Sequence, residues 1–283
     1  MLEGIVGHKR QIDMLARAIA KDRVPHAYIF AGPEGVGKKL VGIWLAKVLI
    51  DPPSFENYFH PDFLLIEDEA GIKIEKIREL IYKLSLKPYS AEYKVALIDR
   101  AETMTLEASN ALLKALEEPK PNTVIILVTS SVERLPKTII SRTQKINFGL
   151  VGEDELKVLV PATLSADQKD LISSVAAGRP GWVKKVLADP ENFTELESWG
   201  LSYQTFNQAE RIDRLLLAQE IAGQETTEIK TLLDFWLVRL ERDLNLTGKP
   251  ELANKLRLVS RARRFIEQNL NAKLVLSELI LAT

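Results

Sequence analysis

The sequence predicts an α/β domain built on a parallel five-stranded sheet, followed by a region made only of helices. Two observations lead to this prediction. Up to about residue 148, short apolar runs of strand length alternate with segments of helical period, as in a parallel sheet covered by helices. Beyond residue 150, helical segments follow one another without strand-like runs. We therefore expect an α/β domain over residues 1–150, a small helical domain over 151–192 and a C-terminal all-α domain over 193–283.

The expected strands are apolar runs bounded by turn signals. The first, Ala27-Tyr28-Ile29-Phe30-Ala31, enters a glycine-rich turn, and a helix follows from Lys38 to Ile50 until Asp51-Pro52-Pro53 ends it. The remaining strands are expected at residues 63–67, 94–99, 123–129 and 145–148, with helices at 74–84 and 105–118.

The second half of the chain has helical spacing only. Segments 153–160, 166–177 and 181–188 form the first expected group, bounded by Pro161 and by the turn Gly178-Arg179-Pro180-Gly181. Beyond Pro190, apolar residues at helical spacing predict long amphipathic helices, with Trp236 in one apolar stripe.

Composition excludes several classes of protein. The 283 residues include 38 Lys and Arg, 39 Asp and Glu, 3 His and no Cys, so disulfides, thiolate nucleophiles and cysteine-based zinc sites are excluded. The near-neutral charge argues against a generally basic nucleic-acid binder. No apolar run approaches the roughly 20 residues of a membrane span, and the first residues lack a secretory signal pattern. We expect no membrane association and a cytoplasmic location.

A phosphate-binding loop is the first candidate site. The run Gly32-Pro33-Glu34-Gly35-Val36-Gly37-Lys38-Lys39 has the two defining glycines and the lysine of that motif, and it lies between a predicted strand and a predicted helix. In that position, backbone N–H groups and the helix N-terminus can hold phosphate oxygens. The candidate residues are Gly32, Gly35, Gly37 and Lys38; a glycine-rich turn without a ligand is the alternative.

The next residue departs from the motif. Position 39 normally carries Ser or Thr, whose hydroxyl ligates the Mg²⁺ that bridges the phosphates, whereas the Lys39 ammonium has no lone pair and repels the metal. Asp99 ends a predicted strand where a Mg²⁺-orienting carboxylate would lie, but Arg100 replaces the glutamate that activates water in hydrolysing ATPases of this type. Glu102 is not expected to take over that role. We therefore predict no hydrolysis and no required cofactor, with a degenerate site (including Lys39 and Asp99) that could hold ATP, ADP or phosphate.

Two further segments carry a resemblance. Residues 109–119, SNALLKALEEP, and residues 135–142, LPKTIISR, resemble bacterial clamp-loader subunits of the AAA+ superfamily, which belong to the DNA polymerase III holoenzyme. The run His60-Pro61-Asp62-Phe63, residues 72–88 and Asn269-Leu270-Asn271 extend the likeness over nearly the whole chain. The resemblance implies a P-loop NTPase (AAA+) domain, a small helical lid and a C-terminal helical collar that forms a ring with other subunits.

The resemblance also implies a role for Ser141 and Arg142. They match the Ser-Arg of a Ser-Arg-Cys motif, with Thr143 in the place of the cysteine. In the family this arginine is a finger that enters the ATP site of the adjacent motor subunit and stabilises charge on the transferred phosphate. Gly181 stands where motor subunits carry a nucleotide-sensing lid arginine. The implied protein is a non-hydrolysing, stationary subunit whose Arg142 acts in trans.

Implied partners follow from the same resemblance. They are the gamma/tau motor subunits and a delta subunit in a pentameric ring and, through that complex, the sliding clamp and primer-template DNA, in ATP-driven clamp loading during replication. Many family members carry a four-cysteine zinc module between the phosphate-loop helix and the next strand. The corresponding interval, residues 51–62, contains no cysteine, so no zinc is expected.

Two other functions remain open at this point. The chain could be an active AAA+ ATPase and clamp-loader motor subunit, which would need a metal ligand and a general base. It could also be a nucleotide-independent DNA-binding or scaffold protein, for which a C-terminal cationic cluster would supply phosphate contacts. A solvated helix face is the alternative interpretation of that cluster, which consists of Arg257, Arg261, Arg263 and Arg264.

Overall fold

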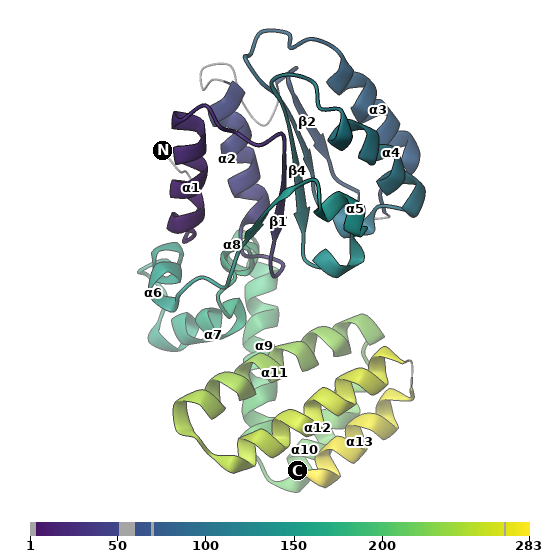
Figure 1. Cartoon of the computed structure of the whole chain (residues 1–283). Helices are drawn as coiled ribbons and strands as arrows, with labels where there is room; N and C mark the ends of the chain where they lie inside the picture. The colour runs from purple at the N-terminus through teal and green to yellow at the C-terminus, as the bar shows by residue number, and fades with distance from the viewer. Residues whose placement is uncertain (1–3, 51–59, 69–70, 269) are drawn as a thin grey trace. The chain divides into compact units, whose positions relative to one another are not determined.

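The computed structural model describes residues 4–50, 60–68, 71–268 and 270–283 (Figure 1). The chain forms two compact units, Met1–Glu155 and Leu156–Thr283. The first is an α/β unit and the second is helical. The expected division of the helical part into two domains stays a prediction.

The α/β unit is built on a five-stranded sheet. Its strand order is β2-β3-β4-β1-β5, and every neighbouring pair is parallel, which confirms the predicted sheet. The last strand lies one residue earlier than expected, and β2 and β3 each end one residue earlier. The strands are β1 (Ala27–Ala31), β2 (Phe63–Ile66), β3 (Lys94–Ile98), β4 (Thr123–Thr129) and β5 (Gln144–Asn147).

Helices cover both faces of this sheet (Figure 1). Successive side chains of a strand point to opposite faces, so Tyr28 and Phe30 enter one core cluster while Ile29 enters the other. Burial on both faces explains why the strands are continuously apolar. One face packs against α1 (Lys9–Ala20) and α2 (Lys38–Ile50), the other against α3 (Ile74–Ser85), α4 (Leu106–Glu117) and α5 (Lys137–Ile140).

A buried acid organises the connection between α3 and β3. Asp62 is fully buried, and its carboxylate accepts hydrogen bonds from the backbone N–H groups of Tyr89, Ser90 and Ala91 at 2.7, 3.0 and 3.1 Å. The Lys94 ammonium lies 3.9 Å away. Although burial by itself raises it, these donors and Lys94 hold the pKa of Asp62 below its ordinary value. The carboxylate therefore fixes this loop as a charged group.

The helical unit has its own core. The rings of Phe206 and Trp236 stack with centroids 4.4 Å apart, and the indole N–H of Trp236 donates to Ser202 Oγ at 3.1 Å, which confirms Trp236 as a core residue. None of the helices in the described parts of the chain is long and apolar enough to cross a membrane. After α6 (Glu153–Leu156), the α-helices are α7 (Ala166–Ala176), α8 (Pro180–Ala188), α9 (Pro190–Gln208), α10 (Arg211–Ile221), α11 (Thr226–Thr247), α12 (Pro250–Glu267) and α13 (Ala272–Ala282).

Candidate functional site

The predicted phosphate loop connects β1 to α2. Gly32, Gly35 and Gly37 have φ values of 153°, 77° and 103°, in the region that favours glycine. At Gly32, a Cβ atom would also lie 2.0 Å from the carbonyl oxygen of Phe148, which follows β5. The glycine spacing thus reflects the backbone path of the loop.

Lys38 is the first residue of α2, and only 6% of its surface is exposed. Its ammonium turns back onto the loop and donates to the carbonyl oxygens of Gly32 and Pro33, both at 2.6 Å. Burial lowers the pKa of Lys38, against the opposing effect of Glu102, Asp99 and Glu34. No carboxylate in the described residues lies within 4.0 Å of this ammonium. Its charge is met chiefly by backbone dipoles.

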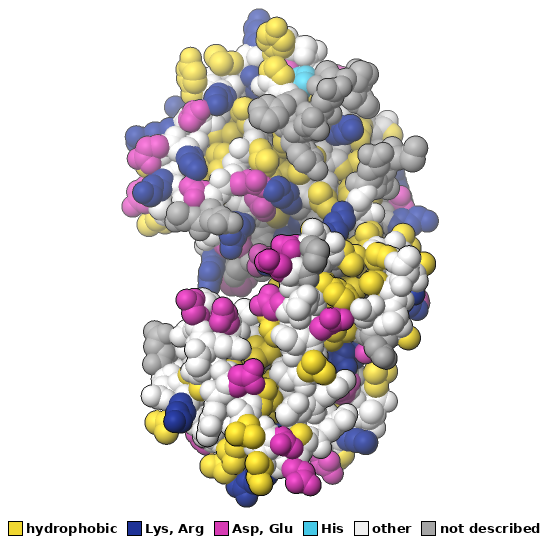
Figure 2. Space-filling view, turned by 180° about the vertical axis from the view of Figure 1, so that it is seen from behind, with side chains coloured by type: hydrophobic (Ala, Val, Ile, Leu, Met, Phe, Trp, Pro, Cys, Tyr) yellow, Lys and Arg dark blue, Asp and Glu magenta, His cyan; other side chains and the backbone are white. Residues whose placement is uncertain are grey.

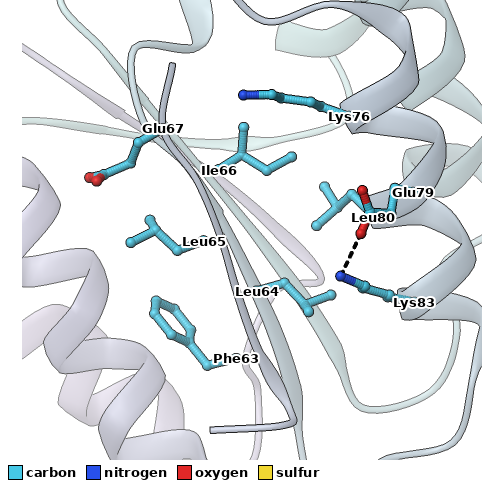
Figure 3. Close-up of a pocket in the computed structure, with 9 residues that line it drawn as sticks. All are labelled: Phe63, Leu64, Leu65, Ile66, Glu67, Lys76, Glu79, Leu80 and Lys83. Atoms are coloured by element: carbon cyan, nitrogen blue, oxygen red, sulfur yellow. Dashed lines mark ion pairs between the residues drawn. The ribbon is translucent and has the colours of Figure 1, made fainter. Parts of the chain in front are cut away.

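Lys39 lies between two carboxylates at the carboxyl ends of adjacent strands. Its ammonium pairs with Glu67, which follows β2, and lies 3.9 Å from Asp99, which follows β3. Figure 3 shows the Glu67 side chain pointing away from α3, on the same side of β2 as Phe63 and Leu65. Lys39, on α2 at the opposite face from α3, meets it there. A cation of the protein therefore occupies the acidic end of the sheet.

The carboxyl groups of Asp99 and Glu102 have pKa values shifted in opposite directions. Burial raises the pKa of Asp99. The Lys39 ammonium opposes this effect, as does the backbone N–H of Arg100, which donates to Asp99 Oδ1 at 3.0 Å. Glu102 accepts from the Ser130 N–H at 3.1 Å and from the Ser130 hydroxyl, and these bonds lower its pKa although burial acts to raise it. An acid with a lowered pKa is a poor base at neutral pH.

The second candidate, Arg142, contacts α4 and α5. One terminal nitrogen lies 2.8 Å from the Glu117 carboxylate, and the other donates to the Thr138 carbonyl at 3.0 Å and to Ser141 Oγ at 3.3 Å. The Ser141 hydroxyl itself donates to the Thr138 carbonyl at 3.1 Å. The side chain of Arg142 is 36% exposed.

Sequence reasoning missed Glu67 and Glu117. Glu67 has the same signal as Asp99, a carboxylate directly after a buried strand, and could have been found by it. Glu117 lies on α4, well before Arg142 in the chain, so no sequence spacing links the two residues. Glu67 is also among the residues of β2, its C-terminal end and α3 that line a pocket of about 370 Å³. Two lysines of this pocket are paired within the chain: Lys83 with Glu79 at 2.7 Å (Figure 3) and Lys76 with Asp68 at 2.8 Å.

Two of the four arginines in the C-terminal cationic cluster form ion pairs within α11, α12 and α13. Arg261 pairs with Glu278, and Arg263 pairs with Asp234 and Glu267 at 2.9 and 2.6 Å. These ion pairs favour a solvated helix surface over a nucleic-acid patch. Figure 2 shows the opposite side of the molecule from Figure 1, where basic and acidic side chains are interspersed.

The described ranges contain no group of three or more His, Cys, Asp or Glu residues that could hold a metal ion. Residues 51–59, which make up most of the interval without a zinc module, lie outside these ranges, so the expected absence of zinc stays a prediction.

The fold and the loop together define a P-loop α/β domain of the AAA+ type. A gamma subunit-related protein of DNA polymerase III from Thermotoga maritima has the same fold, with a TM-score of 0.55 and 22% identity over 96% of this chain and 97% of that one. RuvB from the same organism matches with a TM-score of 0.51 and 15% identity over 83% of this chain and 88% of that one.

The chain belongs to the family described as DNA polymerase III, delta subunit, whose model matches residues 7–151. It is 36% identical to the delta′ subunit of DNA polymerase III from Bacillus subtilis over 153 residues, 49% of this chain and 46% of that protein. The tau subunit of the same organism is 29% identical over 197 residues, 62% of this chain and 35% of that protein. The chain spans about half or less of the length of these relatives.

Proposed function

We propose that this chain is a delta-prime-type subunit of a bacterial clamp loader, a non-hydrolysing member of the DNA polymerase III holoenzyme. The observation that carries the proposal is the Lys39 ammonium between Glu67 and Asp99. The Lys39 ammonium lies where a hydrolysing relative has a hydroxyl that ligates Mg²⁺. Its positive charge repels a divalent cation at this place. Family membership supports the assignment to DNA polymerase III.

Loss of a general base is the second support. Arg100 is exposed at the position of the expected glutamate, and the Glu102 carboxylate is engaged by Ser130. An attacking water would have neither a metal-bound phosphate nor a basic residue beside it. The proposed subunit therefore contributes to ATP hydrolysis only through another subunit's site.

Arg142 is the proposed means of that contribution. Its guanidinium is partly exposed, planar and permanently charged, and its present partner is an exposed carboxylate that a phosphate group can replace. The proposed partners are gamma/tau motor subunits and a delta subunit in a pentameric ring, and through them the sliding clamp and primer-template DNA. A cytoplasmic location is part of the proposal.

An active motor subunit is the second candidate. It is favoured by the intact glycine geometry of the loop and by relatives named gamma or tau, including the Bacillus subtilis tau subunit. The two candidates differ in what the pure protein does with ATP.

The test is a phosphate-release assay on the purified chain with ATP, Mg²⁺ and primed DNA. We expect no turnover above buffer, whereas addition of the gamma/tau and delta subunits of the same bacterium should give DNA-stimulated turnover. A catalytically silenced gamma/tau subunit (phosphate-loop lysine to alanine) serves as the control for the assembled complex. Turnover by the pure chain would select the motor-subunit candidate instead.

A further inference from the structure

A pocket of about 360 Å³ lies between the C-terminal halves of the neighbouring helices α3 and α4, where β4 begins (Figure 1). Its walls are apolar: Ile81 and Leu84 come from α3, Ala115 from α4 and Ile125 from β4. Leu84 and Ile125 are buried core residues, so the packing of the sheet and its helices holds these walls in place. This α3–α4 pocket is therefore formed by the fold of the chain itself.

Three charged side chains border the α3–α4 pocket, and their signs do not balance. Lys114 of α4, Glu118 at the end of α4 and Lys120 in the connection to β4 all line the pocket and are exposed. Among the described residues none of these three forms an ion pair, whereas Lys83 of α3 is paired with Glu79. Two ammonium groups outnumber one carboxylate, so the border of the pocket attracts an acidic partner and repels a basic one.

The size and the surroundings of the pocket favour a protein segment over a free small molecule. Pockets that enclose small molecules range from about 300 to 1,000 Å³, so this one lies near the lower limit. Apolar surface also continues beside it, because Tyr82 directly follows Ile81 on α3 and is 66% exposed. Exposed tyrosines are enriched at protein interfaces, since the ring offers apolar area and the hydroxyl stays wet.

We propose that the α3–α4 pocket docks a segment of a partner protein in which an apolar residue is flanked by acidic residues. The apolar side chain enters between Leu84 and Ala115, and the flanking carboxylates meet the ammonium groups of Lys114 and Lys120. The lysines supply specificity for acidic segments, because a basic segment would bring like charges together. The inference goes beyond the proposed function, since Arg142 and the phosphate loop do not line this pocket.

The test is fluorescence anisotropy of the full chain with an array of short fluorescein-labelled peptides. Each peptide carries one Leu, Ile, Phe or Met with an Asp on either side at varied spacing, and matched peptides carry Ser or Lys in place of Asp. We expect the best acidic peptides to bind roughly tenfold more tightly than their serine counterparts at low salt, and the difference to shrink at about 1 M NaCl. Lack of binding by every acidic peptide, or equal binding by acidic and serine peptides, would overturn the proposal.

Charge reversal at the border of the pocket sharpens the test. The double variant Lys114→Glu with Lys120→Glu should lower the affinity for acidic peptides by roughly tenfold or more and raise it for lysine peptides. Lys9→Glu with Lys47→Glu makes the same change in net charge at exposed positions on α1 and α2 and should bind as the original chain does. Equal affinities of the two double variants would show that the lysines of the pocket are not the contact, and the proposal would fail.

A third variant tests the pocket itself. Ala115→Leu places a larger side chain in the space meant for the apolar residue, and leucine forms helices well, so α4 should persist. Binding of acidic peptides should fall roughly tenfold while circular dichroism stays that of the original chain. Unchanged binding would locate the peptides elsewhere and contradict the proposal.

Sodium octanoate separates the other class of ligand, because it combines an apolar chain with a free carboxylate. We expect octanoate to compete with the acidic peptides only weakly. Binding of octanoate with no binding of any peptide would assign the pocket to small carboxylates and overturn the docking of a protein segment. All these measurements use the isolated chain, so their failure leaves the turnover test of the proposed function interpretable.

Discussion

The phosphate loop and the turn after α5 that carries Arg142 both hold cationic side chains, but these differ in burial and in their partners. At the loop, Lys38 is buried against backbone carbonyls and Lys39 is held by acids from two adjacent strands. At the other segment, Arg142 is partly exposed and paired with one exposed acid, Glu117, whose side chain is 49% accessible. The first arrangement disfavours a metal ion, and the second leaves a guanidinium available to a phosphate group. Under the proposed function, the residues that would hydrolyse ATP and the residue that would assist hydrolysis at another subunit are therefore different.

The largest expected effect is the loss of Arg142. In the assembled complex, Arg142→Ala should lower hydrolysis at the motor site that receives it by roughly 10³-fold, because finger arginines stabilise transferred charge. DNA-stimulated phosphate release measures this, with Arg142→Lys testing the need for a planar fork. Arg134→Ala, an exposed arginine nearby, is the control. An unchanged rate in Arg142→Ala would remove the proposed role.

The next largest effect is expected on the unfolding free energy when Asp62, the buried acid that holds the loop between α3 and β3, is changed. Asp62→Asn should destabilise the α/β unit by about 3 kcal/mol at neutral pH, because a buried carboxylate that accepts three N–H groups loses its charge. Urea unfolding followed by circular dichroism measures this. Glu79→Gln, which alters an exposed pair on α3, should cost about 1 kcal/mol or less.

The pH dependence gives a check on the same variant. The folded-state pKa of Asp62 lies below its unfolded value, so its contribution is complete above the ordinary pKa of aspartate and is lost as pH falls through the folded value. The difference in unfolding free energy between the original chain and Asp62→Asn should therefore shrink in acid. A difference that stays constant with pH would contradict a charged Asp62.

A smaller effect is expected at Glu117. The pair with Arg142 must open before the guanidinium reaches another subunit, and an exposed pair is worth about 1 kcal/mol or less. Glu117→Ala should accordingly raise DNA-stimulated turnover of the complex, by about fivefold at most. Glu118→Ala, the neighbouring exposed acid, is the control. A loss as large as that of Arg142→Ala would instead identify Glu117 as a positioning residue.

The smallest effect is expected at Lys38. Because burial penalises its charge, Lys38→Met should leave the melting temperature unchanged or raise it by up to about 3 °C in buffer without phosphate. Differential scanning calorimetry measures this, and Lys47→Met is the exposed control. A marked destabilisation would mean that the buried ammonium holds the loop together.

Apolar runs and turn signals were sufficient to predict the five strands, and the helices α2, α3, α4, α7 and α8, to within a residue. Beyond residue 190, they predicted helices without their bounds. The helix α1 was missed because His8 precedes it with a φ of 59° and no side-chain cap, so the usual start signal is absent. The helix α5 was missed because its four residues are too few for a periodic pattern. Both helices complete the layers that cover the sheet.

The loop glycines, the lysine at position 39 and the arginine at position 100 can be identified from the amino-acid sequence, since each is a matter of residue type at a fixed spacing. Their partners depend on the folded chain. The strand order places the ends of β2 and β3 side by side, which brings Glu67 and Asp99 to Lys39. The packing of α4 near α5 likewise brings Glu117 to Arg142. Such pairings join residues far apart in the chain, so they depend on how whole elements pack.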